Sequence, residues 1–294
     1  MSDIKIKAEN VRKVFELKHS GKSRSSGRWG NNGGCPRHLM ALDGVNLSVR
    51  TGEFMAIVGP SGCGKSTFLD MIGGLSRPTD GQIFIDDKPI TGPSLNRGIV
   101  FQQYALFPWR TALENIEYGL ESQKIPKKER ADIARRYLSL VNLSDFEGHY
   151  PYQLSGGMKQ RIAIARALAY NPDILLMDEP FGALDAQTRE TLQLELLKIK
   201  EETRKTVIFI THSIEEAVFL ADKTAIMTAS PGVIKEVVDI PLSYETRLSD
   251  EFRVSEEFTR LKQKLWSLLK VEVRKSQELG GICPPECQKC PEAS

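Results

Sequence analysis

Long hydrophobic runs are missing from this sequence. No apolar stretch approaches the roughly 18 residues that a membrane-spanning helix needs, and the first residues, Met1 to Lys5, contain no apolar signal-peptide core. We therefore expect a cytoplasmic chain that crosses no membrane itself. A strong excess of charge is missing too, because 40 Lys and Arg residues face 38 Asp and Glu residues. That balance argues against nucleic acid as a partner.

Cysteine is scarce, with five in 294 residues, and unevenly placed. Cys35 lies in a segment over residues 17–40 whose Gly, Ser and basic residues are typical of a flexible loop. Three more stand together in a Pro-rich tail over 276–294: Cys283, Cys287 and Cys290. Structural disulfides are not expected in the cytosol. The four thiols could ligate an iron–sulfur cluster or Zn²⁺; alternatively, the tail thiols hold no metal.

A glycine-rich segment with one lysine follows a short apolar run. Residues 53–58 are typical of a strand buried on both faces of a parallel sheet, and apolar residues recur at helical spacing after Lys65. The backbone N–H groups between them can approach an anion at the start of the helix. We expect Lys65 to reach the β- and γ-phosphates of a nucleotide and the Ser66 hydroxyl to ligate Mg²⁺. The phosphate-binding residues are Gly59, Ser61, Gly62, Cys63, Gly64, Lys65, Ser66 and Thr67, with Cys63 contributing its backbone only.

Two acidic residues end a second apolar run. Residues 174–177 (Ile-Leu-Leu-Met) precede Asp178 and Glu179. Ligands of an open parallel sheet bind at the carboxyl ends of its strands. We therefore expect Asp178 to hold Mg²⁺ through water and Glu179 to polarise the attacking water.

The order of strand-like and helix-like segments predicts an α/β fold with a mostly parallel sheet. We expect strands over 3–16, 45–50, 174–178, 206–211, 223–228 and 233–239. We expect helices over 112–146, 158–169, 186–203, 213–221 and 249–270. The helix at 158–169 follows Ser155-Gly156-Gly157, which makes its start a second anion-binding end.

These motifs resemble, in order, those of the nucleotide-binding subunits of ABC transporters. The resemblance covers about residues 3–16 and 40–240. Residues 106–111 and 180–186 look most like subunits that serve nitrate, sulfonate, taurine or bicarbonate importers. The matching segments are Val100-Phe101-Gln102 (Q-loop), Leu154-Ser155-Gly156-Gly157-Met158-Lys159-Gln160-Arg161 (signature), Ala183-Leu184-Asp185 (D-loop), Thr211-His212 (switch histidine) and Phe15 (adenine stacking).

The resemblance implies a P-loop NTPase core with a mostly parallel sheet, an antiparallel β subdomain and a helical signature subdomain. It places the nucleotide-binding domain over residues 1–240, with the inserted loop at 17–40 and the helical subdomain at 112–157. A helical extension over 241–275 and the tail over 276–294 follow.

The family also implies roles for individual residues. Gln102, or its neighbour Gln103, joins the Mg²⁺ and water shell, and His212 contacts the γ-phosphate. Phe15 either stacks on adenine or belongs to the core. The signature residues Ser155, Gly156 and Gly157, with Asp185 of the D-loop, complete the ATP site of a second subunit in a head-to-tail dimer.

The expected function is therefore ATP hydrolysis that powers an importer of a small solute. Its partners would be an identical or related ATP-binding subunit, transmembrane permease subunits and an external solute-binding protein. The chain would then lie peripherally on the cytoplasmic face of the cell membrane. The alternatives are a soluble ABC-type ATPase that is not coupled to transport, and a Cys-based sensing module in which ATP hydrolysis is secondary.

Overall fold

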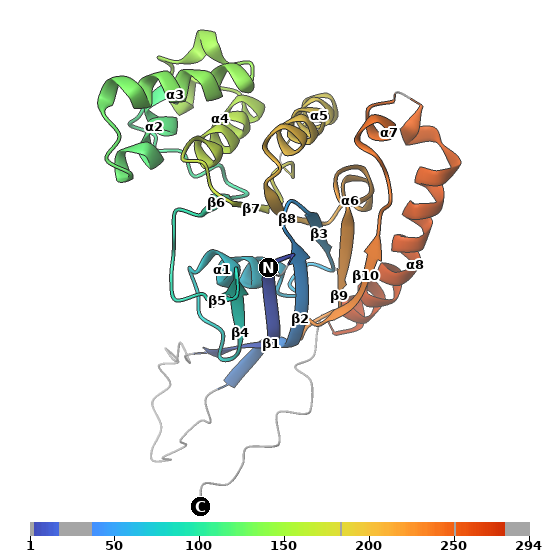
Figure 1. Ribbon diagram of the computed structural model, residues 1–294. Coiled ribbons are helices and arrows are strands. Elements are labelled where there is room, and N and C mark those ends of the chain that lie inside the picture. The colour runs from blue at the N-terminus through green and yellow to red at the C-terminus, as the bar shows by residue number, and fades with distance from the viewer. Residues whose placement is uncertain (1–2, 18–36, 183, 250, 280–294) are drawn as a thin grey trace, which may run out of the picture.

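The computed structural model describes residues 3–17, 37–182, 184–249 and 251–279, and two sheets form its frame (Figure 1). The antiparallel sheet has the order β2-β1-β4-β5, and the larger sheet has the order β10-β9-β3-β8-β7-β6. The strands are β1 Ile4–Leu17, β2 Arg37–Arg50, β3 Phe54–Val58, β4 Asp80–Ile85, β5 Lys88–Pro89, β6 Arg97–Val100, β7 Ile174–Asp178, β8 Thr206–Thr211, β9 Lys223–Met227 and β10 Ile234–Asp239.

The larger sheet is parallel except for the edge strand β10, which pairs antiparallel with β9. Its inner strands are short apolar runs buried along nearly their whole length, as expected where both faces are covered. The parallel register brings the ends of β3, β7 and β8 to one edge. The expected fold class is confirmed.

The antiparallel sheet differs from the sequence expectation in two ways. The strand expected at 45–50 begins already at Arg37 and pairs with β1 over 14 residues on each side, so the hairpin extends into the segment expected as loop. Strands β4 and β5 were not expected. A turn with left-handed Asp86 and Asp87 joins them, and β4 buries only residues near its end, so its sequence lacks a clear alternation.

Helices cover the larger sheet on both faces. They are α1 Lys65–Gly73, α2 Ala112–Ser122, α3 Lys127–Leu140, α4 Gly156–Ala169, α5 Ala186–Thr203, α6 Ile214–Leu220, α7 Tyr244–Leu248 and α8 Glu256–Leu279; short 3₁₀ turns occupy Ser144–Phe146, Pro151–Gln153 and Phe252–Val254. Helix α1 packs between the two sheets. Helices α4, α5, α6 and α8 cover the opposite face.

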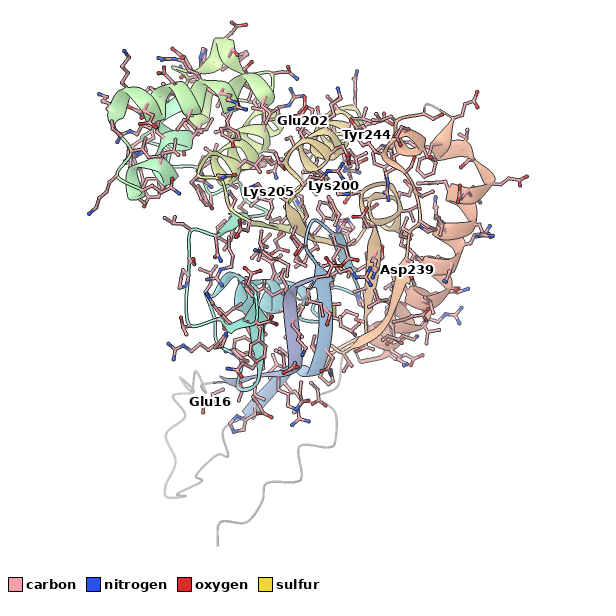
Figure 2. The ribbon with its side chains drawn as sticks, in the orientation of Figure 1. Glu16, Lys200, Glu202, Lys205, Asp239 and Tyr244 are labelled. Atoms are coloured by element: carbon pink, nitrogen blue, oxygen red, sulfur yellow. The ribbon has the colours of Figure 1, made fainter. Side chains whose placement is uncertain are left out.

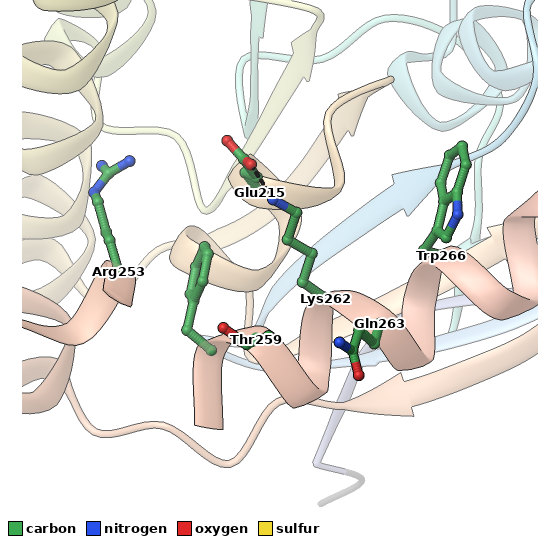
Figure 3. Close-up of a pocket in the computed structure, with 7 residues that line it drawn as sticks. Glu215, Arg253, Thr259, Lys262, Gln263 and Trp266 are labelled. Atoms are coloured by element: carbon green, nitrogen blue, oxygen red, sulfur yellow. Dashed lines mark hydrogen bonds and ion pairs between the residues drawn. The ribbon is translucent and has the colours of Figure 1, made fainter. Parts of the chain in front are cut away.

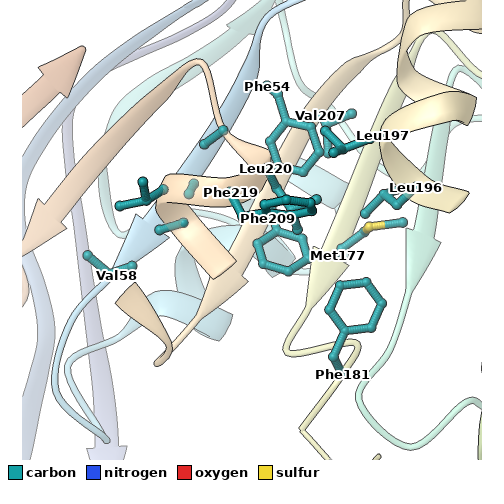
Figure 4. Packing of buried hydrophobic residues seen from close by; sticks show 14 of the residues in the cluster. Phe54, Val58, Met177, Phe181, Leu196, Leu197, Val207, Phe209, Phe219 and Leu220 are labelled. Carbon is teal, nitrogen blue, oxygen red and sulfur yellow. The ribbon is translucent and has the colours of Figure 1, made fainter. Parts of the chain in front are cut away.

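Side chains on the two faces of the larger sheet pack into two different hydrophobic cores, because successive side chains of a strand point to opposite faces. Phe54, Met177 and Phe209 pack with the helices on one side, as Figure 4 shows, and the Phe209 ring lies between those of Phe54 and Phe181 at 5.7 Å from each. Met55 and Ile57 of β3 point to the other face and pack with α1. Figure 2 shows the side chains on this frame.

A third core holds α2, α3 and α4 together as a helical group at the edge of the molecule (Figure 1). Helix α2 begins with a capping box, in which Thr111 accepts from the N–H of Glu114 and Glu114 accepts from that of Thr111. Ile116, Leu138 and Ile162 meet at its centre and are fully buried.

The C-terminal helix begins later than expected, at Glu256 instead of 249, because Ser255 accepts a hydrogen bond from the N–H of Phe258 and a 3₁₀ turn precedes it. Phe258, Leu261, Leu265 and Leu269 recur at helical spacing and join the core around Phe209. Within the described ranges, no helix is both long and apolar enough to span a membrane.

Candidate nucleotide-binding site

The phosphate loop connects β3 to α1. Gly62 and Gly64 both have left-handed backbones, with φ of 76° and 99°, and Gly64 is the N-cap of α1. A Cβ at Gly59 would lie 2.8 Å from Cys63 Sγ and 2.9 Å from the Met227 carbonyl oxygen. The glycines are therefore required by backbone geometry and by close packing. Ser61, Ser66 and Thr67 lie in the same loop and first helical turn.

Lys65 is buried at the start of α1, with 6% of its surface exposed. Its ammonium donates to the carbonyls of Gly59 and Pro60 at 2.9 Å each, so it lies over the phosphate loop. It also lies 3.9 Å from Cys63 Sγ. Burial raises the pKa of the Cys63 thiol, which favours its neutral form.

The Ser66 hydroxyl donates to Asp178 Oδ1 at 3.1 Å, although 112 residues separate the two in sequence. Burial, helped by the charges of Glu179 and Asp70, raises the pKa of Asp178 against the opposing hydrogen bond from Ser66. A partly buried carboxylate beside a hydroxyl needs a cation, and oxygen donors are the ligands that Mg²⁺ prefers. Ser66 and Asp178 therefore fit the metal.

Glu179 and His212 come together at the same sheet edge, from β7 and β8. His212 Nδ1 lies 3.3 Å from Glu179 Oε2. The backbone of Glu179 is left-handed, with φ of 43°, and its N–H donates to the Ile210 carbonyl. A non-glycine residue in this region is strained, and such strain gathers at functional sites.

The turn that carries His212 is held by Thr211 and by two residues that the sequence did not point to, Ser213 and Glu216. The Thr211 hydroxyl donates to Glu216 at 2.5 Å and accepts from the N–H of Ser213. Ser213 caps α6 by accepting from the N–H of Glu216. Burial raises the pKa of Glu216. The pattern Ser213-x-x-Glu216 was visible as a helix-start signal and could have located this turn.

The Q-loop lies close to the turn that follows Glu179. A Cβ on Gly182 would lie 3.9 Å from Gln102 Nε2. Both Gln102 and Gln103 are exposed, so burial does not separate them. The contact with Gly182 favours Gln102 as the residue that faces the site.

The signature residues begin α4 in the helical group, whereas the phosphate loop precedes α1 between the sheets (Figure 1). Ser155 is the N-cap of α4 and accepts from the N–H of Met158, with Gly156 and Gly157 forming the first turn. A Cβ on Gly157 would lie 2.4 Å from Thr188 Cγ2. Asp185 caps α5 through the N–H of Thr188, and this hydrogen bond lowers the pKa of Asp185. The first turn of α4 therefore packs against the first turn of α5, which Asp185 of the D-loop caps.

Phe15 lies on β1 opposite Leu39 and is 41% exposed. The Lys13 ammonium lies 5.2 Å from the centre of its ring. An exposed ring can stack on a base, which a core ring cannot.

The candidate metal ligands Cys35, Cys283, Cys287 and Cys290 lie outside the described residues. Within the part of the chain that the structure describes, no three His, Cys, Asp or Glu side chains lie together as a metal-binding group, so Ser66 and Asp178 would hold Mg²⁺ together with phosphate and water oxygens.

Two grooves lie on elements that neighbour the site rather than among the nucleotide-binding residues. One, of about 410 Å³, lies beside the Q-loop in the helical group and is lined by Ile99, Phe101, Ala105, Phe107, Tyr118 and Arg166. The other, of about 400 Å³, lies between α6 and α8, where an ion pair joins Glu215 and Lys262 (Figure 3). Trp266 lines this second groove and is half exposed.

The carboxyl edge of the larger sheet thus combines a phosphate loop, an oxygen pair suited to Mg²⁺ and a carboxylate–imidazole pair, which are the requirements of a P-loop ATPase. The chain matches the sequence profile of the ABC transporter family over residues 42–182. The chain belongs to this family: it is an ATPase of the ABC type and an ATP-binding subunit of a transporter.

Relatives and solved structures resemble the chain over most of its length. An uncharacterized ABC transporter ATP-binding protein of Methanocaldococcus jannaschii is 50% identical over 273 residues, 93% of this chain and 94% of its own. The nitrate import ATP-binding protein NrtD of Synechocystis is 45% identical over 79% of this chain and 89% of its own length. A dimeric ATP-binding cassette in a post-hydrolysis state with ADP and phosphate superposes with a TM-score of 0.67 at 36% identity, covering 80% of this chain and 98% of that one.

Proposed function

We propose that this chain powers an importer of a small oxyanion-like solute, such as nitrate, a sulfonate, taurine or bicarbonate. The support for this solute class is the similarity to NrtD and to the bicarbonate transport ATP-binding protein CmpD of Synechocystis, which is 50% identical over 74% of this chain and 77% of its own length. The observation that carries the ATPase chemistry is the pairing of Glu179 with His212 beside Asp178.

The residues divide the chemistry among them. The phosphate-loop amides and Lys65 bind the β- and γ-phosphates, and Phe15 supports the adenine. Ser66 and Asp178, with Gln102, hold Mg²⁺, which when bound neutralises charge on the phosphates. Glu179 orients and polarises the attacking water, and His212 holds the Glu179 carboxylate and contacts the γ-phosphate. Positioning and electrostatic stabilisation of this kind are what phosphoryl transfer requires.

A second subunit completes each site. The signature helix α4 belongs to the helical group, and its N-terminus with Ser155, Gly156 and Gly157 can face the γ-phosphate of a neighbouring chain in a head-to-tail dimer. ATP then joins two subunits and its hydrolysis releases them. The dimeric state of the superposed cassette supports this arrangement.

The groove beside the Q-loop is the surface we propose for the permease. Its wall includes Phe107 and Tyr118, whose ring centres lie 4.5 Å apart with the rings tilted by 52°, and Arg110 lies behind them, 5.2 Å from the centre of the Tyr118 ring. The nearby Trp109 is 71% exposed, which leaves a large apolar surface for a membrane partner. Contact there would hold the chain peripherally on the cytoplasmic face of the membrane, and an external binding protein would deliver the solute.

Glu179→Gln tests the mechanism because it keeps the shape of the side chain and removes the charge that polarises water. We expect ATP binding to persist, turnover to fall by roughly 10²-fold or more, and an ATP-dependent dimer to accumulate in size-exclusion chromatography. Glu202→Gln, an exposed acid on α5, is the control and should behave as the wild type. Normal turnover in the Glu179 variant would remove this residue from the proposed role.

The alternative function is that of a soluble ABC-type ATPase without a permease. A pull-down with this chain from detergent-solubilised membranes distinguishes the two functions. Recovery of a membrane protein that depends on Phe107 and Trp109 supports the importer. If the cells express the neighbouring reading frames and the pull-down recovers no membrane protein, the result favours the soluble ATPase.

We also propose a metal site formed by Cys283, Cys287 and Cys290 with Cys35 as a fourth ligand, an iron–sulfur cluster or Zn²⁺. Its support is the spacing of the three tail thiols. Such a site would make transport sensitive to redox state or metal supply. Protein purified anaerobically should contain nearly stoichiometric metal, and colourless protein without iron or zinc would contradict this.

A further inference from the structure

The backbone of the Q-loop is strained just after Gln102. Tyr104 and Ala105 are both left-handed, with φ of 56° and 46°. Neither is glycine, and two such residues in succession persist only where their surroundings hold them in place. The residue that holds them therefore influences where the Q-loop lies.

Arg166 of the signature helix α4 provides that hold. Its guanidinium donates to the Ala105 carbonyl at 2.6 Å and to the Tyr104 carbonyl at 3.1 Å. It also lies 5.7 Å from the centre of the Phe107 ring and lines the groove beside the Q-loop. Among the described residues no Asp or Glu forms an ion pair with Arg166, and its guanidinium donates to these two Q-loop carbonyls instead. The rigid fork of arginine suits two carbonyls at once.

The same segment touches the start of α4. A Cβ on Gly156 would lie 3.1 Å from the Tyr104 hydroxyl oxygen and 3.8 Å from Leu184 of the D-loop. Tyr104 is thus held at its carbonyl by Arg166 and packs its side chain against the signature loop. Both contacts come from one helix, so the Q-loop and the signature loop are tied together within one subunit.

We infer that Arg166 is a positioning residue that fastens the Q-loop to the signature helix, so that displacement of the Q-loop at one ATP site is carried to the signature loop that serves the other. This rests on the proposed head-to-tail dimer. A segment that fills the groove would press on Phe107 and Ala105, which Arg166 joins to α4, and would thereby act on both ATP sites.

A mixed dimer separates the two sites. One full-length chain carries Glu179→Gln and a first tag, the other carries wild-type Glu179 and a second tag, and the dimer is purified through both tags with ATP. Only the phosphate loop of the wild-type chain then turns over, and it uses the signature of the Glu179→Gln chain. Arg166→Lys, which keeps the charge but loses the two-pronged hold, is placed on either chain.

With Arg166→Lys on the Glu179→Gln chain, the altered Q-loop lies at the inactive site. We expect single-turnover hydrolysis at the other site to fall roughly tenfold, the effect of about one charge-assisted hydrogen bond, with ATP affinity unchanged. Arg135→Lys is the matched control in the same helical group; Arg135 of α3 lies outside the signature motif and instead pairs with Glu147, so the rate should not change.

The inference would be overturned if the hydrolysis rate fell only when Arg166→Lys is on the chain whose own site turns over. Arg166 would then support only the Q-loop of its own ATP site. An equal loss in the Arg135 control would mean that the helical group is destabilised in general, and this would overturn the inference as well. If the Glu179→Gln chain with unchanged Arg166 does not form a dimer with ATP, that result would instead refute the proposed function.

A double substitution provides a second readout in the intact homodimer. Gly156→Ala places a methyl group against the Tyr104 hydroxyl, and Tyr104→Phe removes that oxygen. We expect Tyr104→Phe to restore part of the turnover lost in Gly156→Ala, because residues in contact are not additive. Strictly additive effects would contradict the contact between the two loops.

Discussion

Asp178 is a carboxylate that the fold has partly removed from water. Its pKa lies above the ordinary 3.8 because burial disfavours the charged form and because Glu179 and Asp70 are nearby acids. The folded chain therefore binds this proton more tightly than the unfolded chain does. Without metal, the stability associated with Asp178 is present below 3.8 and is lost as pH rises through its raised pKa.

Asp178→Asn should consequently stabilise the metal-free protein at neutral pH. We expect a higher urea midpoint than the wild type at neutral pH in EDTA, and a difference that vanishes as the pH falls below the ordinary Asp range. MgATP should reverse the order, because the variant lacks a proposed Mg²⁺ ligand and is therefore stabilised less by the bound nucleotide than the wild type. The exposed Asp145→Asn is the control and should show neither effect. A lower midpoint for the Asp178 variant in EDTA would contradict the assignment.

At the scale of elements, the active site depends on how α4, α5 and α6 meet. Arg247 of α7 donates to the carbonyls of Val218 and Ala221 at the end of α6, and burial lowers its pKa to about 10. Since α6 starts directly after His212, a buried arginine far from the nucleotide helps to place the switch histidine. The charge remains because even the lowered pKa lies well above neutrality.

The α4–α5 contact gives a prediction at this scale. Gly157→Ala should reduce the free energy of unfolding by about 1–3 kcal/mol, the usual cost of overpacking, because its Cβ would lie 2.4 Å from Thr188 Cγ2. Adding Thr188→Ser removes that methyl group and should recover much of the loss in urea denaturation. Gly148→Ala, where an added Cβ meets nothing within 4 Å, serves as the control. No recovery in the double variant would show that the helices do not touch here.

At the scale of the whole molecule, α8 is part of the main core. Its apolar face joins the same cluster as β3, β7 and β8. The aligned stretch of the Methanocaldococcus relative, 273 of 294 residues, necessarily includes most of this helix. The ion pair between Glu215 and Lys262 links α8 to α6, and thus to the element that follows His212.

Two neighbouring residues of α8 test this packing. Leu265 is fully buried, and Leu265→Ala should cost about 2–5 kcal/mol in unfolding free energy. Trp266 is 50% exposed, and Trp266→Ala should stay within about 0.5 kcal/mol. Chemical denaturation measures both. Similar, small effects of the two changes would mean that α8 is only loosely attached.

The ATP-site motifs could be read from the sequence because their chemistry is local. A glycine loop between a strand and a helix, and acids at the end of an apolar run, each need only a few adjacent residues. The strands at 174–178 and 206–211 and the helix at 186–203 also agree with the structure, since fully buried apolar runs are easily recognised and the helix repeats Leu192, Leu196 and Ile199 at helical spacing. Strands β4 and β5 are largely exposed and β6 has only four residues, so none of the three carries such a pattern.

Pairings across the chain were decided by the tertiary structure alone. Ser66 meets Asp178 because β3 and β7 both flank β8 in one parallel register, and no spacing in the sequence encodes that neighbourhood. Arg166 meets Tyr104 and Ala105 across about 60 residues, through backbone carbonyls that every residue possesses. A contact through a backbone carbonyl does not depend on residue type, so the sequence cannot reveal it. The sequence by itself determined the family, the ATP chemistry and most elements. Only the fold decided which loops are joined to which helices.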